Sequence, residues 1–310
     1  MTVELQDVVI RYGSFTAVSS VTVTLPTGAV GLLGRNGAGK SSILKSLLGL
    51  VRPTSGRMRI LDLPESAPAA EIRARVGYMP ERDCHLPGMS GFEMVSMLGQ
   101  LSGLPERDAY RRSHEALYLC GLEEQRYRPV SGYSAGMRQK AKLAAALVHD
   151  PQVVFLDEPT NGLDPDGRAE MLRLVHRLAH KLGKSVVLST HILQDVEAVC
   201  DAAVVLEQGK VVAQGRIEDL CRATERRYHV QVEPATVEIP DHILAGVRIA
   251  SQGAGRFVVE VEGDLEPREL FALVQGRGGT VRELVPHRRS LEEVFLGAVR
   301  SAEAQRGVSA

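Results

Sequence analysis

The stretch GRNGAGKS, residues 34–41, decides the fold of this chain. It follows a short apolar run that begins at Ala29 and precedes a helical pattern that extends to Leu50. Glycines let successive backbone N–H groups point to one side, where they can surround an anion. The start of the following helix adds its positive dipole end. This complete pattern between a strand and a helix predicts a phosphate-binding loop.

The residue types of this loop suit a nucleotide triphosphate. Lys40 can reach the β- and γ-phosphates, the Ser41 hydroxyl can bind Mg²⁺, and Ser42 can add a hydrogen bond. The alternative is a glycine-rich structural turn with a surface lysine, and the complete match disfavours it. The predicted phosphate contacts are Gly34, Arg35, Asn36, Gly37, Ala38, Gly39, Lys40, Ser41 and Ser42.

A second motif, VVFLDE at residues 153–158, places two acids at the end of an apolar run. In a parallel sheet, the carboxyl ends of the strands face the ligand crevice. Asp157 can then hold Mg²⁺, and Glu158 can polarise a water for attack on the γ-phosphate. The alternative is an acidic helix cap before Pro159. The motif alone leaves both interpretations open, and the phosphate loop favours the catalytic one.

The overall composition excludes several classes of protein. The chain has 310 residues, with 37 Lys and Arg against 38 Asp and Glu, a formal net charge of −1. Hydrophobic residues make up 44%, so wholesale disorder is excluded. The near-neutral charge argues against a large basic surface, and we expect no nucleic-acid partner. The widely spaced cysteines Cys84, Cys120, Cys200 and Cys221 predict neither a disulfide framework nor a structural zinc site.

No segment has the pattern of a signal peptide or a membrane span. Glu4 and Asp7 lie where a secretory signal would carry basic and then apolar residues. The stretch Gly13–Gly34 has no charge and is long enough to cross a bilayer. From Val21 to Leu25, however, apolar residues alternate with threonines, which indicates a strand. We therefore expect the chain to be soluble.

The chain divides into two regions by its patterns. Over residues 1–220, apolar strands alternate with helical segments, which predicts a mainly parallel sheet covered on both faces. From about Pro87 to Ala146 the sequence lacks β-branched runs and shows helical spacing. Beyond Leu220, two stretches alternate with period two and a helical pattern follows at about 267–275. We expect a small α+β domain over residues 221–310.

The stretch YSAGM, residues 133–137, opens a helical run and resembles the signature motif of the ATP-binding cassette (ABC) family, whose common form is LSGGQ. Ser134 and Gly136 keep the hydroxyl and the small residue that can approach a phosphate at a helix N-terminus. Ala135 and Met137 depart from the common form. The resemblance implies that Ser134, Ala135 and Gly136 contact the nucleotide.

Further positions match landmarks of this family in its order. Tyr12 lies where the family places an aromatic that stacks on adenine, and His191 matches the histidine that contacts the γ-phosphate. Glu81 stands where glutamine is usual, and its carboxylate can still meet Mg²⁺ or a bound water. Asp164 lies in a stretch that resembles the D-loop, with Gly162 in place of the usual alanine.

The resemblance implies a P-loop NTPase of the ABC cassette type over residues 1–220. This α/β fold has a RecA-like core sheet, a helical subdomain and an antiparallel β subdomain. The stretch RRSLEEVFL, residues 288–296, resembles the end of a small C-terminal domain. That domain is found on exporter ATPases whose membrane subunits are separate chains.

The implied function is ATP hydrolysis that powers an exporter, with ATP and Mg²⁺ as cofactors. Lys40, Glu158 and His191 are the expected catalytic residues, and Ser41, Asp157 and Glu81 the expected metal ligands. The expected partners are a second copy, arranged head to tail around two ATP molecules, and separate transmembrane permease subunits. These partners would hold the chain at the cytoplasmic face of the cell membrane.

Two other functions compete with this interpretation. One is a non-transport ABC ATPase that drives an envelope or regulatory machine. The other is a simple P-loop kinase, which the motif at Ser134 and the histidine at position 191 disfavour.

Overall fold

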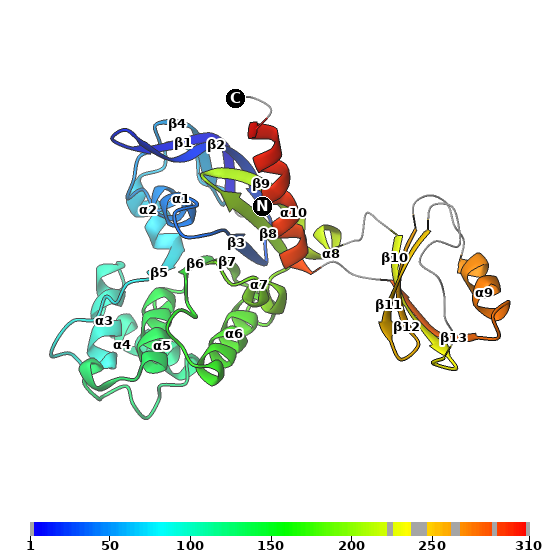
Figure 1. Ribbon diagram of the computed structural model, residues 1–310. Coiled ribbons are helices and arrows are strands. Elements are labelled where there is room, and N and C mark those ends of the chain that lie inside the picture. Colours follow the sequence, from blue (N-terminus) through cyan, green and yellow to red (C-terminus); the bar gives the residue numbers. More distant parts are fainter. Residues whose placement is uncertain (1–2, 222–225, 237–246, 262–266, 287–289, 308–310) are drawn as a thin grey trace. The chain divides into compact units, whose positions relative to one another are not determined.

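The computed structural model describes residues 3–221, 226–236, 247–261, 267–286 and 290–307 (Figure 1). Its contacts divide the chain into two units, Met1–Leu220 with Phe295–Ala310, and Cys221–Val294. The expected C-terminal domain of residues 221–310 therefore includes a last helix that is grouped mostly with the first unit. Two residues of the 288–296 stretch lie outside the described residues.

The centre of the first unit is a six-stranded sheet with the strand order β5-β6-β7-β3-β8-β9. All neighbouring strands are parallel except β8 and β9. The strands β3, β6 and β7 are buried at every position, which explains the apolar stretches that they contain. The bounds are β3 Ala29–Leu33, β5 Val76–Met79, β6 Val153–Asp157, β7 Ser185–Thr190, β8 Ala202–Glu207 and β9 Lys210–Arg216.

A separate antiparallel sheet of three strands has the order β2-β1-β4. It consists of β1 (Val3–Tyr12), β2 (Phe15–Leu25) and β4 (Ser55–Ile60). Its apolar side chains join one core with those of the six-stranded sheet and of α1 (Lys40–Leu47). Helix α1 therefore packs in the core that the two sheets share, directly after the phosphate loop.

A group of helices lies on the other side of the first unit, drawn in cyan and green in Figure 1. The helical segment predicted between Pro87 and Ala146 is present here. It comprises α3 (Gly91–Leu101), α4 (Glu106–Leu119), a 3-10 turn at Val130–Gly132 and α5 (Ala135–Leu147). The Ser90 side chain accepts a hydrogen bond from the Glu93 backbone, and the Glu93 carboxylate accepts one from the Ser90 backbone, so α3 begins with a capping box.

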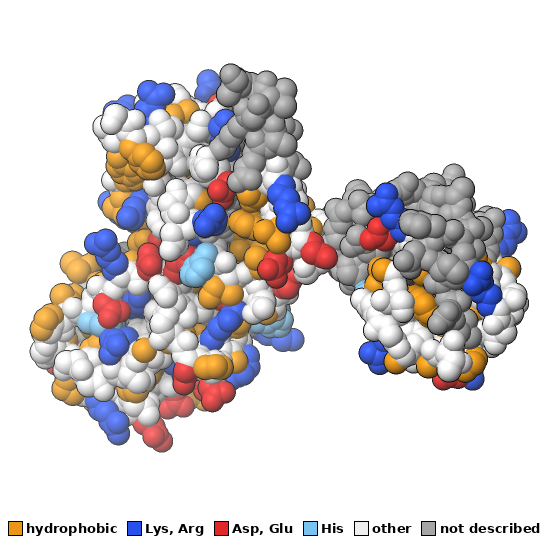
Figure 2. Space-filling view, viewed as in Figure 1, with side chains coloured by type: hydrophobic (Ala, Val, Ile, Leu, Met, Phe, Trp, Pro, Cys, Tyr) orange, Lys and Arg blue, Asp and Glu red, His pale blue; other side chains and the backbone are white. Residues whose placement is uncertain are grey.

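The remaining helices of the first unit connect and cover the strands. They are α2 (Ala69–Arg75), α6 (Pro165–His180), α7 (Leu193–Val199) and α8 (Ile217–Leu220), with α10 (Leu291–Gly307) at the end of the chain. Among the described residues, no helix has both the length and the apolar character needed to cross a membrane. Basic and acidic side chains are interspersed over the visible face of this unit (Figure 2).

The second unit contains an antiparallel sheet of four strands in the order β11-β12-β10-β13. Its small core combines one face of this sheet with Val274 of helix α9. The period-two alternation seen in the sequence follows from this, because one side of each strand faces the core and the other faces solvent. The bounds are β10 Arg226–Glu233, β11 Val247–Gly253, β12 Arg256–Val261, α9 Pro267–Gln275 and β13 Thr280–Pro286.

Candidate functional site

The phosphate loop connects the end of β3 to the first residue of α1. Gly37 and Gly39 have left-handed backbones, with φ of 82° and 102°. A Cβ atom at position 39 would lie 2.6 Å from the Ala17 carbonyl oxygen. Glycine is therefore required here both by conformation and by the close approach of β2.

The Lys40 ammonium lies inside the loop that precedes it. Its side chain is 6% exposed, and Nζ donates to the carbonyl oxygen of Gly34 at 2.6 Å. The same nitrogen is 3.4 Å from Oε1 of Glu158. A positive charge is thus held where the backbone N–H groups of the loop and the start of α1 also favour an anion.

Asp157 ends the buried strand β6 and meets the loop directly. Its Oδ1 atom accepts hydrogen bonds from the Ser41 hydroxyl at 3.2 Å and from the Ser189 hydroxyl at 2.9 Å. Tyr78 donates to Oδ2 at 3.4 Å. Burial, with the charge of Asp157 as the second cause, raises the pKa of Tyr78, so the phenol remains a donor. The hydroxyl of Ser41 and the carboxylate of Asp157 form a pair of hard oxygen donors that suits Mg²⁺.

Glu158 connects the phosphate loop to the end of β7. It has a left-handed backbone with φ of 50°, which is uncommon for a residue with a side chain and concentrates at functional sites. Its carboxylate is nearly buried, and Oε2 is 3.0 Å from Nδ1 of His191. Lys40, Glu158 and His191 therefore form one continuous chain of charged and polar groups.

A cavity of about 260 Å³ opens beside this chain of groups. Its mouth carries two exposed aromatic rings, Tyr12 and Phe15, which pair across the turn between β1 and β2. Exposed aromatic faces suit stacking against a flat base. The lining residues are Tyr12, Phe15, Ala17, Arg35, Asn36, Gly37, Ala38, Gly39, Lys40, Ser41, Ser42, Glu81 and Glu158.

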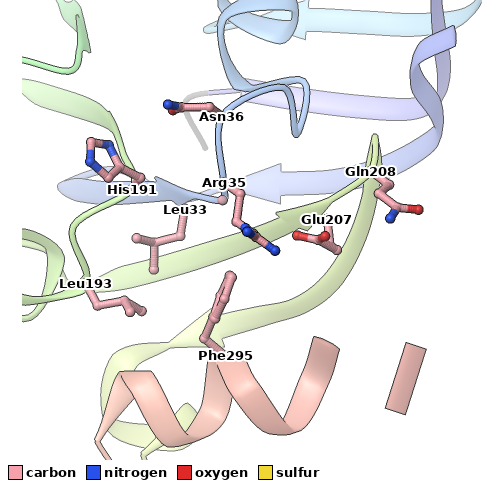
Figure 3. A pocket seen from close by; sticks show the side chains of 9 residues that line it. Leu33, Arg35, Asn36, His191, Leu193, Glu207, Gln208 and Phe295 are labelled. Carbon is pink, nitrogen blue, oxygen red and sulfur yellow. The ribbon is translucent and has the colours of Figure 1, made fainter. Parts of the chain in front are cut away.

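A second cavity of about 570 Å³ also borders the phosphate loop. In Figure 3, Arg35 and Glu207 approach the space into which Phe295 of α10 reaches. This cavity contains the site residues Gly34 and His191, which do not line the first cavity. The lining residues are Leu33, Gly34, Arg35, Asn36, His191, Leu193, Glu207, Gln208 and Phe295.

The remaining expected site residues lie on two other helix N-termini. The Ser134 side chain caps α5 and accepts from the backbone N–H of Met137 at 3.2 Å. Asp164 caps α6 in the same way, accepting from Gly167 at 3.0 Å. Ser134, Ala135, Gly136 and Asp164 line neither of the two cavities at the phosphate loop. A Cβ atom at Gly136 would meet no atom within 4 Å, so the start of α5 faces open space.

Three residues of this site were not predicted from the sequence. Phe15 lines the first cavity, and Tyr78 and Ser189 donate hydrogen bonds to Asp157. The signal for Ser189 was its place near the end of a buried strand, since it pairs in register with Asp157. The signal for Phe15 was its position across a tight turn from Tyr12.

This chain is similar to known proteins over most of its length. Residues 18–161 match the family model described as ABC transporter. Residues 215–299 match the model described as ATP-binding protein DrrA1-3-like, C-terminal domain. An uncharacterized ABC transporter ATP-binding protein of Nostoc sp. is 34% identical over 275 residues, which cover 88% of this chain and 80% of the relative.

Other relatives have more specific names. The Nod factor export ATP-binding protein I of Burkholderia lata is 33% identical, with 95% of each chain covered. The bacitracin transport ATP-binding protein of Enterococcus faecalis is 32% identical, with 70% of each chain covered. A solved ATP-binding subunit of an ABC transporter has a TM-score of 0.64 and 30% identity, covering 72% of this chain and 92% of that one.

The predicted ABC cassette fold is confirmed by the solved relatives. The family model, the relatives and the fold all agree with one another. The chain belongs to the ABC transporter family, as an ATP-binding subunit and ATP hydrolase.

Proposed function

We propose that the chain powers an exporter by closing and opening on ATP as a dimer, and that it acts on separate membrane permease subunits. The observation that carries this proposal is the convergence of Lys40, Glu158 and His191 at the phosphate loop, while Ser134 lies on a different helix. The pocket carries groups suited to phosphoryl transfer, and the start of α5, where Gly136 faces open space, lies outside it.

Each residue of the pocket has a specific role in this proposal. Lys40 exchanges its contact with the Gly34 carbonyl for phosphate oxygens, and Glu158 orients the attacking water and accepts its proton. His191 holds the Glu158 carboxylate and reaches the γ-phosphate. Ser41 and Asp157 would hold Mg²⁺, with Glu81 facing the same cavity. The ion, when bound, neutralises charge on the phosphate oxygens.

A second copy would complete the pocket. The starts of α5 and α6, with Ser134, Ala135, Gly136 and Asp164, are exposed or half-buried and lie outside the nucleotide cavity. A helix N-terminus attracts anions, so the start of α5 from the second copy can contact a γ-phosphate held by the first. The two-fold pairing that results uses the same surface on both copies.

Export is the direction favoured by the relatives and by the C-terminal segment. Relatives are named for Nod factor export, bacitracin transport and linearmycin resistance. Residues 215–299 match a C-terminal domain model named for a related ATP-binding protein. We infer that the permease partners hold the chain at the cytoplasmic face of the membrane.

A nucleotide-binding experiment tests the pocket. Lys40→Ala removes a buried ammonium that would donate charge-assisted hydrogen bonds to the phosphate oxygens. We therefore expect ATP affinity to fall about ten- to hundredfold. Lys45→Ala changes an exposed lysine on the same helix and should bind as the unchanged protein does. Equal ATP affinity for both variants would contradict the assignment of the loop.

Co-purification tests the partner. The full chain, expressed with the genes adjacent to its own and isolated from detergent-solubilised membranes, should carry a multi-span permease whose presence stimulates ATP turnover. Isolation with an envelope or regulatory protein and no permease would favour the non-transport function instead.

A further inference from the structure

Lys142 lies on α5, about two turns after Ser134. Its side chain is 0% exposed, although it ends in an ammonium. Nζ donates to the carbonyl oxygens of Pro80 at 2.9 Å and of Glu81 at 3.0 Å. Oδ1 of Asp83 lies 3.9 Å from the same nitrogen. One buried ammonium therefore binds the backbone of the loop that follows β5.

This arrangement is costly unless the hydrogen bonds are made. Burial lowers the pKa of Lys142, because the charged form loses its hydration, while the negative charge of Asp83 opposes that shift. An apolar side chain would fill the same space without this penalty. A lysine can donate hydrogen bonds to the backbone carbonyl groups that follow the end of β5 at Met79. An apolar residue cannot.

The loop that Lys142 holds carries Glu81 into the nucleotide cavity. The Glu81 carboxylate accepts from the Asn161 side chain at 3.4 Å. Gln139, also on α5, donates to the Asn161 carbonyl oxygen at 3.2 Å. Helix α5 thus contacts the backbone of Glu81 directly and its carboxylate through Asn161.

We propose that Lys142 is a positioning residue for Glu81, which it fixes to the helix that begins at Ser134. The inference rests on the proposed place of Glu81 near the metal that accompanies ATP. A displacement at the start of α5 then moves the Glu81 backbone as well, because both are attached to one rigid helix. The start of α5 at Ser134 and the side of the pocket at Glu81 are therefore mechanically connected within one copy.

The test measures how much Mg²⁺ strengthens binding of a fluorescent, non-hydrolysable ATP analogue to the full chain. Lys142→Met keeps the length and apolar stem and removes the donors. We expect the Mg²⁺-dependent gain in affinity to fall about tenfold, the usual size for loss of a group that orients a metal ligand. Binding of the analogue without Mg²⁺ should stay within about twofold. Lys140→Met, on the same helix but paired with Glu170, is the matched control.

A double-mutant cycle separates positioning from general damage. Glu81→Ala should itself reduce the Mg²⁺-dependent gain, and adding Lys142→Met to it should then change little, because Lys142 acts through Glu81. An equal loss in both backgrounds, no loss in either single variant, or the same loss in Lys140→Met would overturn the proposal.

Folding of each variant is checked by circular dichroism. If Lys142→Met does not fold, the same cycle is measured with Lys142→Gln, whose amide can still donate to one carbonyl. ATP turnover by the unchanged protein and by Lys140→Met is recorded in parallel. Turnover there would leave the proposed function standing even where the Lys142 proposal fails.

Discussion

At the scale of single residues, Glu158 is held from two sides in the pocket. It lies between the Lys40 ammonium and the His191 ring, on a left-handed backbone, and is almost excluded from solvent. The lysine contacts one oxygen of its carboxylate and the histidine contacts the other. A group placed in this way is suited to accept the proton of an attacking water.

We predict that Glu158→Gln retains ATP binding and loses turnover by about a hundredfold or more, since an amide cannot act as the base. The shape of the side chain and the loop around Lys40 remain unchanged. Steady-state phosphate release and equilibrium ATP binding check the two parts separately. Glu170→Gln, on the surface helix α6, is the control. Turnover of Glu158→Gln within a few fold of this control would remove Glu158 from its assigned role.

The sequence predicted the contiguous parts of the pocket and missed the parts that meet through the sheet. GRNGAGKS and the Asp157–Glu158 pair are local patterns, so their residue types and spacing are visible in one dimension. Ser189 and Tyr78 reach Asp157 only because β7 and β5 both flank β6. The burial of Lys142 could not be predicted either, because a lysine in a helical pattern indicates a solvated face.

At the scale of elements, the long helices and the buried strands were the predictable ones. The segment from Pro87 to Ala146 has many turns of helical spacing, and β6 and β7 contain the uninterrupted apolar stretches 153–156 and 186–188. The helices α2 and α7 each have 7 residues, about two turns, so their periodicity is too short to stand out. β5 has only 4 residues, which is too short for its pattern to stand out.

His149 connects two of these elements and predicts a pH dependence of stability. Its Nε2 is 3.2 Å from the carbonyl oxygen of Val76, where β5 begins, and its buried Nδ1 has no partner in the described part of the chain. Burial lowers the pKa of His149 below the usual 6.5, so the unfolded chain takes up the proton first. The stability from burying the neutral ring is present above 6.5 and is lost as the pH falls below it.

We therefore expect the free energy of unfolding to decrease on acidification from about pH 7 to about pH 5.5, by at most about 1.4 kcal/mol per pH unit for this one proton. His149→Gln keeps a donor for Val76 and does not titrate, so its slope should be shallower. Urea unfolding at several pH values measures both slopes. The exposed His176→Gln should follow the unchanged protein. Parallel slopes for His149→Gln and His176→Gln would contradict this account.

At the scale of the whole molecule, the order of the motifs indicated the family, and the division of the chain was harder to predict. After Leu220, apolar and polar residues alternate with period two. This alternation marks where the second sheet begins, because its strands have one solvated face. The last helix, α10, is grouped mainly with the first unit, and Phe295 lines a cavity beside the phosphate loop. No local pattern shows which of two cores a terminal helix will join, because that depends on contacts distant in sequence.

If two copies share each pocket, two inactive variants with different defects should restore ATP turnover when they are mixed. Lys40→Ala disables the phosphate loop of its own copy, and Gly136→Asp places a carboxylate at the start of α5, where there is open space for it. Each variant alone forms only defective pockets. A mixed dimer has one pocket with an intact Lys40 from one copy and an intact Gly136 from the other. Mixing the two inactive proteins should therefore restore ATP turnover, up to about a quarter of the unchanged level if pairing is random.

Analytical sedimentation with a non-hydrolysable ATP analogue tests the same pairing by measuring the mass of the particle that forms. Neither variant alone should form a nucleotide-dependent dimer, and the mixture should, because one intact pocket holds the γ-phosphate from both sides. Glu170→Gln, mixed with Lys40→Ala, controls for pairing with a copy that is intact in both respects. A pocket complete within a single copy gives a different result: Gly136→Asp would be active alone, and mixing would add nothing. That outcome would refute the shared pocket and leave the assignment of the phosphate loop intact.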